Sequence, residues 1–492
     1  MRYKSSSGVH HLSKEIGITA KRSENFSDWY VQVVTKAGLA DYSAVKGFII
    51  LRPYGHAIWE RIQKYVNRHL KKTGHENAYF PVLIPESLLS KEAEHFAGFI
   101  PEVFWVTRAG NNELGERLAT RPTSETIAYA SFGKWIRSWR DLPLLLNFWN
   151  SVLRAEIKAT RPFIRTSEFL WQEGHTVHAT KEEAAAEVMM IANMYSRLME
   201  HVLAIPVLVG YKSDKEKFVG ALYTVTLEGM MPDGKALQMG TSHNLGQNFS
   251  KPFEIKFLGK DGQEHFAWQA SWGISWRLIG AVVMTHGDDK GLVLPPRIAP
   301  IQCVIVTIFY KEADKGRILS KAKEVFDVLS AEKIRTFIDD REQYTPGWKF
   351  NEWEMKGVPL RIEIGPRDVE KGQITVVRRD SSEKFIVKIG SVAAEIKHVL
   401  VQIQKNLHEK ALKLNETKTK TANSYGELKS YIEVDAGFVK APWCGRMECE
   451  VQVKVETGAD IRLIPLKEEK LETNCLVCGQ AAKHTAYFSR AY

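Results

Sequence analysis

The sequence contains no long hydrophobic run and has little cysteine. No segment approaches the roughly 18 consecutive apolar residues that a membrane-spanning helix requires. The opening residues Met-Arg-Tyr-Lys-Ser-Ser-Ser-Gly lack the apolar core of a secretory signal. Five cysteines in 492 residues are too few for a disulfide-stapled fold, and four of them cluster near the C-terminus. We therefore expect a cytoplasmic protein with no membrane partner.

Length and composition predict a globular protein of several domains. Hydrophobic residues make up 44% of the chain and charged residues 26%, which is enough apolar surface to offset the entropy cost of folding. Single hydrophobic cores stop growing at roughly 250 to 300 residues, so we expect two to four domains. The net charge of +10 would attract a polyanion such as nucleic acid, although charge alone leaves a merely basic surface as the simpler explanation.

The first part of the chain predicts an α+β domain on an antiparallel sheet. After an N-terminal lead at 1–22, apolar residues recur at helical spacing over 25–39 and 56–72. The run 78–84 is strand-like, and Pro81 marks it as a strand edge or an interface. Short apolar strands at 144–153, 169–176 and 223–227 then alternate with polar loops around one helix at 181–203. We assign residues 23–298 to this domain.

Two smaller domains are expected after the break at Leu294-Pro-Pro-Arg297. A strand at 301–308 is followed by helices from about 316 and 348, strands near 336, 360 and 374, and a helix from 391, which is typical of a mixed α/β domain. It covers residues 299–406. Residues 407–430 lose apolar content and indicate a linker. Residues 431–492 remain as a small α+β domain.

Three arginines occur in matched contexts. Val152-Leu-Arg154-Ala-Glu156, Phe163-Ile-Arg165-Thr166 and Phe169-Leu-Trp171-Gln-Glu173-Gly-His175 form a strand, loop, strand unit with two arginines, and Ser271-Trp-Gly-Ile-Ser275-Trp-Arg277 adds a third before a probable helix. Guanidinium groups that face one cleft suit an α-phosphate and a nearby carboxylate, because arginine stays charged and binds both in bidentate fashion. A single strand arginine more often serves a surface salt bridge, but three in such contexts favour a binding site.

These stretches, together with Pro81 after its long helix, resemble the three signature motifs of class II aminoacyl-tRNA synthetases. Arg121-Pro-Thr-Ser-Glu-Thr126 and Gly240-Thr-Ser-His243-Asn-Leu-Gly-Gln-Asn248 are similar to the substrate loops of prolyl-tRNA synthetases. The resemblance extends from about Ser23 to Tyr492. It implies a proline–tRNA ligase that activates proline with ATP to prolyl-adenylate and pyrophosphate, then transfers prolyl to the 3′ end of tRNA(Pro).

The resemblance also implies roles for individual residues. For proline, Thr123 and Glu125 take the amine and Arg154 the carboxylate, while the ring pocket is shaped by Phe99, Trp171, Phe218 and His243. Phe99 and Phe218 could equally be core residues. The arginines Arg154, Arg165 and Arg277 are expected to act in catalysis, with Mg²⁺ bridging the phosphates of ATP. The expected ATP contacts are Arg154, Glu156, Arg165, Thr166, Gln238, Thr241, Ser275 and Arg277.

The second domain resembles the anticodon-binding domain that several class II synthetases share. Its most recognisable stretch is Pro359-Leu-Arg361-Ile-Glu363-Ile-Gly-Pro-Arg367-Asp. Arginine and glutamate side chains can read base edges, so Arg361, Glu363 and Arg367 are candidate contacts to the anticodon. A salt bridge within the domain is an open alternative for each.

The C-terminal cysteines predict a structural zinc site. Cys444 and Cys449 form one close pair, and Cys475 and Cys478 form another, the arrangement that a tetrahedral Zn²⁺ requires. Four reduced buried thiols are the alternative. The segment resembles the zinc-binding extension of the archaeal and eukaryotic-type members of the family, whose last residue, Tyr492 here, is expected to reach back to the catalytic domain.

Assembly and rival functions are the remaining questions. The family resemblance implies a homodimer formed through the first motif, but the apolar stripe of the 56–72 helix could equally be internal core. A non-catalytic tRNA-binding paralogue would lack the arginines or Glu125, all of which are present. A synthetase for threonine, serine or glycine would share the class but not the Thr-Ser-Glu and Gly-Thr-Ser-His loops. The short spacing between Trp171 and Arg277 leaves no room for a large editing insertion.

Overall fold

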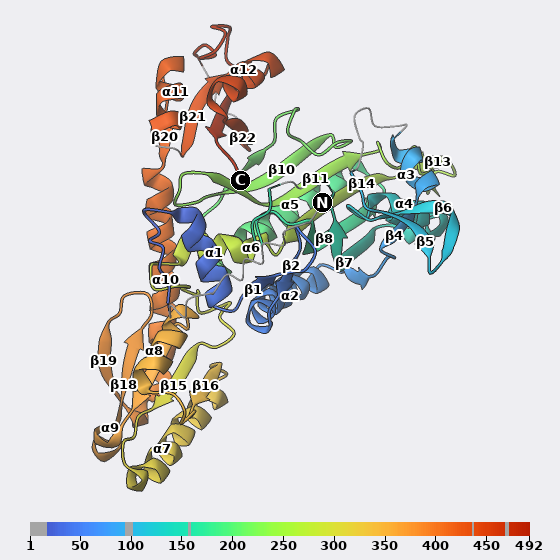
Figure 1. Cartoon of the computed structure of the whole chain (residues 1–492). Helices are drawn as coiled ribbons and strands as arrows, with labels where there is room; N and C mark the ends of the chain where they lie inside the picture. The colour runs from blue at the N-terminus through green and yellow to red at the C-terminus, as the bar shows by residue number, and fades with distance from the viewer. Residues whose placement is uncertain (1–16, 94–101, 156–158, 435–436, 468–471) are drawn as a thin grey trace, which may run out of the picture.

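A sheet of eleven strands runs through the catalytic and C-terminal parts of the molecule (Figure 1). The computed structural model describes residues 17–93, 102–155, 159–434, 437–467 and 472–492. The strands lie in the order β20 (Thr419–Thr421), β21 (Phe438–Trp443), β23 (His484–Ser489), β22 (Asp460–Pro465), β9 (Leu208–Tyr211), β10 (Tyr223–Met230), β11 (Ala236–Gly246), β14 (Trp268–Ser275), β8 (Glu168–His178), β7 (Leu144–Leu153) and β3 (Glu76–Ala78).

The catalytic part of this sheet is antiparallel from β9 to β7, which confirms the predicted class of fold. Only β3 joins it in parallel, beside β7. The strand-like run at 78–84 is divided between β3 and β4 (Leu83–Pro85), so the expectation of one strand was wrong. Pro81 lies between the two strands, where its missing N–H costs no ladder bond.

Helices pack the sheet into the largest hydrophobic core of the chain. They are α1 (Phe26–Lys36), α2 (Pro53–Lys72), α5 (Lys181–Arg197), its π-helical continuation η2 (Leu198–Val202) and α6 (Arg277–His286). The apolar stripe of α2, from Ile58 through Ile62 and Val66 to Leu70, is fully buried in this core. Tyr65, the remaining member of the stripe, is only partly buried, and the internal-core alternative holds for the other four residues.

Smaller elements surround the catalytic sheet. A three-stranded sheet contains β4, β6 (Asn112–Thr120) and β5 (Trp105–Ala109), beside α3 (Glu86–Ala93) and α4 (Glu125–Trp135). Two hairpins pair β1 (Ala40–Tyr42) with β2 (Ile49–Leu51) and β12 (Lys256–Leu258) with β13 (Glu264–Phe266). A short 3-10 helix, η1 (Trp139–Asp141), precedes β7.

The second domain has the expected mixed α/β pattern and extends away from the catalytic sheet (Figure 1). Its five strands lie in the order β16 (Thr336–Asp339), β15 (Cys303–Thr307), β17 (Leu360–Ile364), β18 (Gln373–Arg378) and β19 (Lys384–Lys388). Only β16, β15 and β17 are parallel to one another. Its helices are α7 (Glu312–Ala331), α8 (Pro346–Met355), α9 (Pro366–Lys371), η3 (Ile389–Ser391) and α10 (Val392–Thr417).

The segment predicted as a linker, 407–430, is instead built from regular elements. Helix α10 continues without a break to Thr417, followed by β20 and α11 (Tyr425–Val434), so the predicted boundary at 431 falls inside a helix. Leu407 and Ala411 are buried. Two apolar residues four positions apart keep one helix face packed although the segment as a whole is polar. In Figure 1, α10 spans the distance between the second and the C-terminal domains.

The C-terminal domain, defined here as β20 to β23 with α11 and α12 (Met447–Thr457), continues the catalytic sheet. Its strand β22 pairs antiparallel with β9, with Ile464 opposite Tyr211 and Pro465 opposite Gly210. The domain therefore shares backbone hydrogen bonds with the catalytic sheet. Within the described part of the chain, no helix is sufficiently long and hydrophobic to cross a membrane.

Candidate active site

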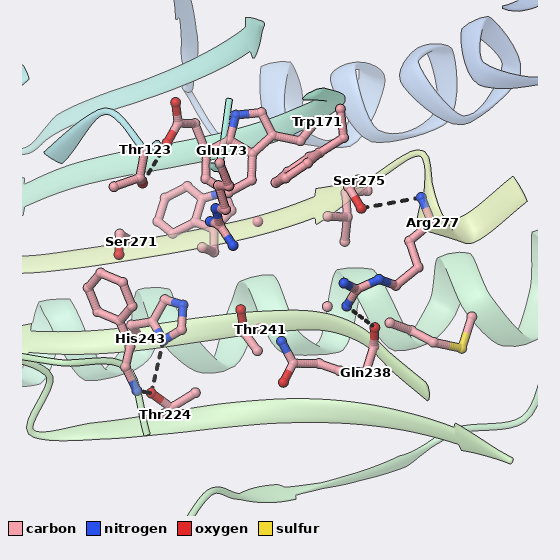
Figure 2. Close-up of a pocket in the computed structure, with 18 of the residues that line it drawn as sticks. Thr123, Trp171, Glu173, Thr224, Gln238, Thr241, His243, Ser271, Ser275 and Arg277 are labelled. Carbon is pink, nitrogen blue, oxygen red and sulfur yellow. Dashed lines mark hydrogen bonds between the residues drawn. The ribbon is translucent and has the colours of Figure 1, made fainter. Parts of the chain in front are cut away.

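A cavity of about 280 Å³ opens over β8, β11 and β14. Every predicted proline- and ATP-binding residue that the structure describes lines it, and Figure 2 shows the residues converging from two sides. Phe99 and Glu156 lie outside the described residues. The lining residues predicted from sequence are Thr123, Glu125, Arg154, Arg165, Thr166, Trp171, Phe218, Gln238, Thr241, His243, Ser275 and Arg277.

The three arginines meet because of strand direction. Arg154 follows the end of β7, Arg165 precedes the start of β8, and Arg277 follows the end of β14. These three points share one edge of the sheet, because β8 runs antiparallel to both neighbours, with Leu153 opposite Glu168 and Ser275 opposite Trp171. Residues far apart in sequence are thus brought to one end of the cavity.

Backbone carbonyl groups orient two of these guanidinium groups. Arg154 Nε donates to the Pro122 carbonyl oxygen at 3.3 Å. Arg277 donates from Nε to the Ile164 carbonyl at 3.3 Å and from Nη1 to the Gln238 carbonyl at 3.2 Å. Burial, followed by the positive charge of Arg154, lowers the pKa of Arg277 to about 10, so it remains charged at neutral pH. Clustered cations held by neutral carbonyls favour an anionic ligand.

The opposite end of the cavity carries two carboxylates and a histidine. Glu125, the first residue of α4, accepts a hydrogen bond from the Thr123 hydroxyl. Glu173 on β8 accepts hydrogen bonds from Asn150 Nδ2 at 2.9 Å and from His175 Nε2 at 3.1 Å. Ligand atoms of Glu125, Glu173 and His175 lie within 4.8 Å of one another. The cluster could hold a cation, either an amine or a metal ion.

Mutual charge sets the protonation of this cluster. Burial raises the pKa of Glu125, and the neighbouring charge of Glu173 adds to the effect. Burial also opposes ionisation of Glu173, but the hydrogen bond and charge of His175 outweigh it and lower that pKa. The two carboxylates in turn raise the pKa of His175 against its burial. Glu125, Glu173 and His175 therefore form one cluster in which His175 interacts with both carboxylates.

Aromatic side chains line the cavity beside this cluster. Trp171 is fixed by a hydrogen bond from Nε1 to Asn150 Oδ1 at 2.5 Å. The rings of Phe218 and His243 lie 4.7 Å apart, and His243 Nδ1 is hydrogen-bonded to Thr224 Oγ1 at 2.9 Å (Figure 2). Burial, followed by the positive charge of His175, lowers the pKa of His243 to about 3. His243 is therefore neutral and forms part of an apolar wall.

Two buried hydroxyl groups in the cavity have no hydrogen-bond partner among the described residues. They are Thr166 Oγ1 and Ser271 Oγ. Buried polar groups are nearly always satisfied, so both hydroxyls indicate contact with a ligand. Sequence reasoning did not select Ser271, Glu173 or Thr224 as site residues, although the first two stand inside quoted motifs. Lys212 and Glu216 also line the cavity, and their charged segment offered no signal.

The predicted anticodon residues lie on and after β17. Arg361 donates from Nε and Nη2 to Glu363 Oε1 at 3.0 and 2.9 Å, and Lys384 Nζ donates to Glu363 Oε2 at 2.8 Å. Arg361 and Glu363 therefore form a salt bridge within the domain. Arg367 is exposed on α9.

The four C-terminal cysteines form one cluster. Their sulfur atoms lie within 4.8 Å of one another, and Cys444 Sγ is 3.6 Å from the sulfurs of both Cys449 and Cys478. All five cysteines of the chain are free thiols. Four sulfurs bonded to one zinc ion at about 2.3 Å lie roughly 3.8 Å apart, so these residues fit a tetrahedral metal ion.

Tyr492 packs against the catalytic domain. Its hydroxyl donates to Asp233 Oδ2 at 2.6 Å, and its backbone N–H donates to the Ala236 carbonyl at 3.2 Å. The guanidinium of Arg161 lies 5.4 Å from the centre of its ring. The expectation that this residue reaches back is confirmed.

Comparison with known proteins gives three family models that match successive parts of the chain. "tRNA synthetase class II core domain (G, H, P, S and T)" matches residues 104–286, "Anticodon binding domain" matches 302–398, and "Prolyl-tRNA synthetase, C-terminal" matches 425–492. A proline–tRNA ligase of Cenarchaeum symbiosum is 56% identical over 478 residues, which cover 97% of this chain and 100% of that protein. A proline–tRNA ligase of Alkaliphilus oremlandii is 53% identical over 468 residues, covering 95% and 96% of the two chains.

Proposed function

The chain belongs to the proline–tRNA ligases, a family of class II aminoacyl-tRNA synthetases, and we propose that the cavity described above performs both steps of its reaction. One observation carries this assignment of residues. A buried carboxyl group, Glu125, and three arginines line one cavity. Proline, with its cationic amine and its carboxylate, fits between them when ATP binds beside the arginines.

Proline binds through its two charged groups and through contacts to its apolar ring. The amine of proline takes the place beside Glu125 and Thr123, with Glu173 and His175 behind them. Arg154 receives the carboxylate, and Trp171, Phe218 and His243 enclose the ring, with Phe99 as a further candidate. The buried Ser271 hydroxyl without a partner among the described residues supports a polar contact at the same site.

Activation transfers an adenylyl group to the carboxylate. An oxygen of the proline carboxylate attacks the α-phosphorus of ATP, the bond to the bridging oxygen breaks, and pyrophosphate leaves with the electron pair. Arg154, Arg165 and Arg277 stabilise the charge that spreads over the phosphoryl oxygens. Glu156, Thr166 and Ser275 are proposed contacts to the rest of the nucleotide. Mg²⁺ would supply charge neutralisation on the phosphates. Gln238 and Thr241 are further proposed contacts to the nucleotide.

The second step passes prolyl from the adenylate to the 3′ end of tRNA(Pro), with AMP as the leaving group. The match of residues 302–398 to an anticodon-binding domain supports recognition of the other end of the tRNA. We assign anticodon contact to the surface beside β17 and α9, with Arg367 as the accessible cation. Arg361 and Glu363 would contribute from their salt bridge.

We further propose zinc at the four cysteines, where it would fix two loops and the start of α12 without taking part in the reaction.

A homodimer is supported by large apolar side chains that remain exposed near the first motif, such as Tyr79 at 70%, Trp135 at 52% and Ile50 at 54%. Cytoplasmic location is supported by the clustered cysteines, because a metal-binding arrangement of thiols suits a reducing compartment.

The decisive experiment is ATP–pyrophosphate exchange measured with each of the twenty amino acids. We expect exchange with proline alone, and loss of at least a hundredfold in Arg154→Ala. Arg108→Ala is the matched control, because Arg108 is an exposed arginine of the same domain, paired with Glu113. Absence of proline-dependent exchange in the folded wild-type protein would overturn the proposal.

A further inference from the structure

One side of the amino-acid cavity is formed by a segment that has little structure of its own. Residues 212–218, called the pocket wall below, follow β9 as turns and contribute Lys212, Glu216 and Phe218 to the cavity lining. Inside the catalytic domain, the Lys212 N–H donates to the Thr224 carbonyl at 2.9 Å, and the Phe218 N–H donates to the Thr224 hydroxyl at 3.0 Å. The N–H groups of Glu216 and Lys217 donate to the Ser213 carbonyl at 3.1 and 2.9 Å, so Ser213 anchors the turn and its contacts affect the whole segment.

The C-terminal domain reaches the pocket wall through a buried ionic triad. Glu228 on β10 is completely buried, and its two oxygens are shared between the two sides. Lys212 Nζ of the pocket wall donates to Oε1 at 2.8 Å. Arg462 of β22 donates to Oε2 from Nε at 3.1 Å and from Nη2 at 2.9 Å. A buried carboxylate is stable only when its charge is paired. Glu228 therefore fixes the positions of both Lys212 and Arg462.

Two more side chains of the C-terminal domain reach the same segment. Glu450 on α12 accepts a hydrogen bond from the Ser213 hydroxyl at 2.8 Å, and both residues are buried. Asp460, at the start of β22, lies 3.6 Å from Lys215 Nζ. Ser213 and Lys215 are therefore attached directly to residues more than two hundred positions later in the chain, and Lys212 is linked to Arg462 through Glu228.

Backbone pairing fixes the position from which these side chains act. Gly210 of β9 lies opposite Pro465 of β22. A Cβ atom at Gly210 would stand 2.3 Å from the Ile464 carbonyl oxygen, so only glycine permits this close approach. The C-terminal domain thus meets the last residues before the pocket wall along its backbone as well as through its side chains.

The pocket wall in turn touches the residues that face the proline ring. Phe218 packs on His243, with ring centres 4.7 Å apart. The hydroxyl of Thr224 receives the Phe218 N–H and is hydrogen-bonded to His243 Nδ1 at 2.9 Å, as Figure 2 shows for Thr224 and His243. A displacement of the pocket wall would therefore change the apolar side of the proline site. The arginines at the other end are held by β7, β8 and β14.

We propose that the C-terminal domain sets the affinity for proline by positioning the pocket wall through Arg462 and Glu450. Both are positioning residues, because Arg462 contacts Glu228 and Glu450 contacts Ser213, and neither lines the cavity. The inference rests on the proposed function of the cavity. It assigns to this domain a specific effect on the amino acid in preference to ATP.

The test compares Arg462→Met, Arg462→Lys and Ser213→Ala with the wild-type protein. Lys429→Met is the matched control, since Lys429 belongs to the same domain and pairs with Glu456 at the surface. Proline and ATP are varied separately in pyrophosphate exchange, and thermal unfolding is recorded for each protein. Hydrogen–deuterium exchange of residues 213–218 follows the pocket wall independently of any activity.

In Arg462→Met we expect KM for proline to rise at least tenfold, KM for ATP to change less than threefold, and amides of the pocket wall to exchange at least tenfold faster. Arg462→Lys should recover most of the proline KM, because it restores the charge, and Ser213→Ala should raise that KM about threefold. A lower unfolding temperature with an unchanged proline KM would overturn the inference by reducing the domain to a structural support.

If Arg462→Met does not fold, Ser213→Ala provides the test instead. This variant loses only one hydrogen bond, the one from Ser213 to Glu450, and should therefore fold. A proline KM equal to that of wild type, with unchanged deuterium exchange in 213–218, would then overturn the inference. If the wild-type protein lacked proline-dependent exchange, the proposed function would fall, whereas the deuterium data would still report whether Arg462 holds the pocket wall.

Discussion

Replacing Glu125 by glutamine should lower kcat/KM for proline about a hundredfold. The side chain is buried, 3% exposed, and glutamine keeps its shape but removes the charge opposite the amine. Breaking a buried ion pair costs about 3 to 5 kcal/mol. The lower end applies here, because the carboxylate of Glu173 stays within 4.8 Å of the same position. At about 1.4 kcal/mol per factor of ten, 3 kcal/mol corresponds to roughly a hundredfold.

Acidification should reproduce part of this loss in the wild-type protein. Burial raises the pKa of Glu125 above the ordinary value of about 4.3. Protonation removes the negative charge, so kcat/KM for proline should fall as the pH falls through this raised pKa. The free enzyme governs that profile. In Glu125→Gln the same acid limb should be absent.

Pyrophosphate exchange at varied proline concentration and at several pH values measures both effects. Glu113→Gln is the control, because Glu113 is an exposed glutamate of the same domain. A kcat/KM for Glu125→Gln within threefold of wild type, in a protein with an unchanged unfolding temperature, would refute the assignment of Glu125 to the amine. An acid limb that survives in the variant would assign the pH dependence to another group.

Removing metal with a chelator should lower the unfolding temperature by roughly 5 °C or more, since structural zinc contributes directly to folding. Elemental analysis that finds no metal before chelation would contradict the zinc proposal. Arg367→Ala should lower kcat/KM for tRNA about tenfold in aminoacylation and leave pyrophosphate exchange unchanged, because a base contact is worth about 1 to 3 kcal/mol. Arg317→Ala, an exposed arginine on α7, is the control, and an equal loss there would indicate a nonspecific effect of charge.

Local patterns in the sequence predicted most elements of the fold. The apolar spacing of α2, the short apolar runs of β7 and β8, and the break before β15 each depend on residues a few positions apart, and all three appear in the structure. The segment 407–430 was misread, because low apolar content hides the two residues, Leu407 and Ala411, that keep α10 packed. Average composition does not report which face of a helix is buried.

The sequence by itself determined which residues to expect in the site. Residue types and spacing predicted the arginines and the four cysteines, the family resemblance predicted Glu125, and the structure brings the residues of each set together. Only the tertiary structure decided how they are connected. The pairing of Glu173 with His175 and the salt bridge of Arg361 with Glu363 each join residues two positions apart on one strand. The contacts of Arg462 with Glu228 and of Ser213 with Glu450 depend instead on the docking of two domains. Ser213 and Glu450 are 237 positions apart, and no local periodicity encodes a contact over that distance, because it arises from the way separate elements pack together.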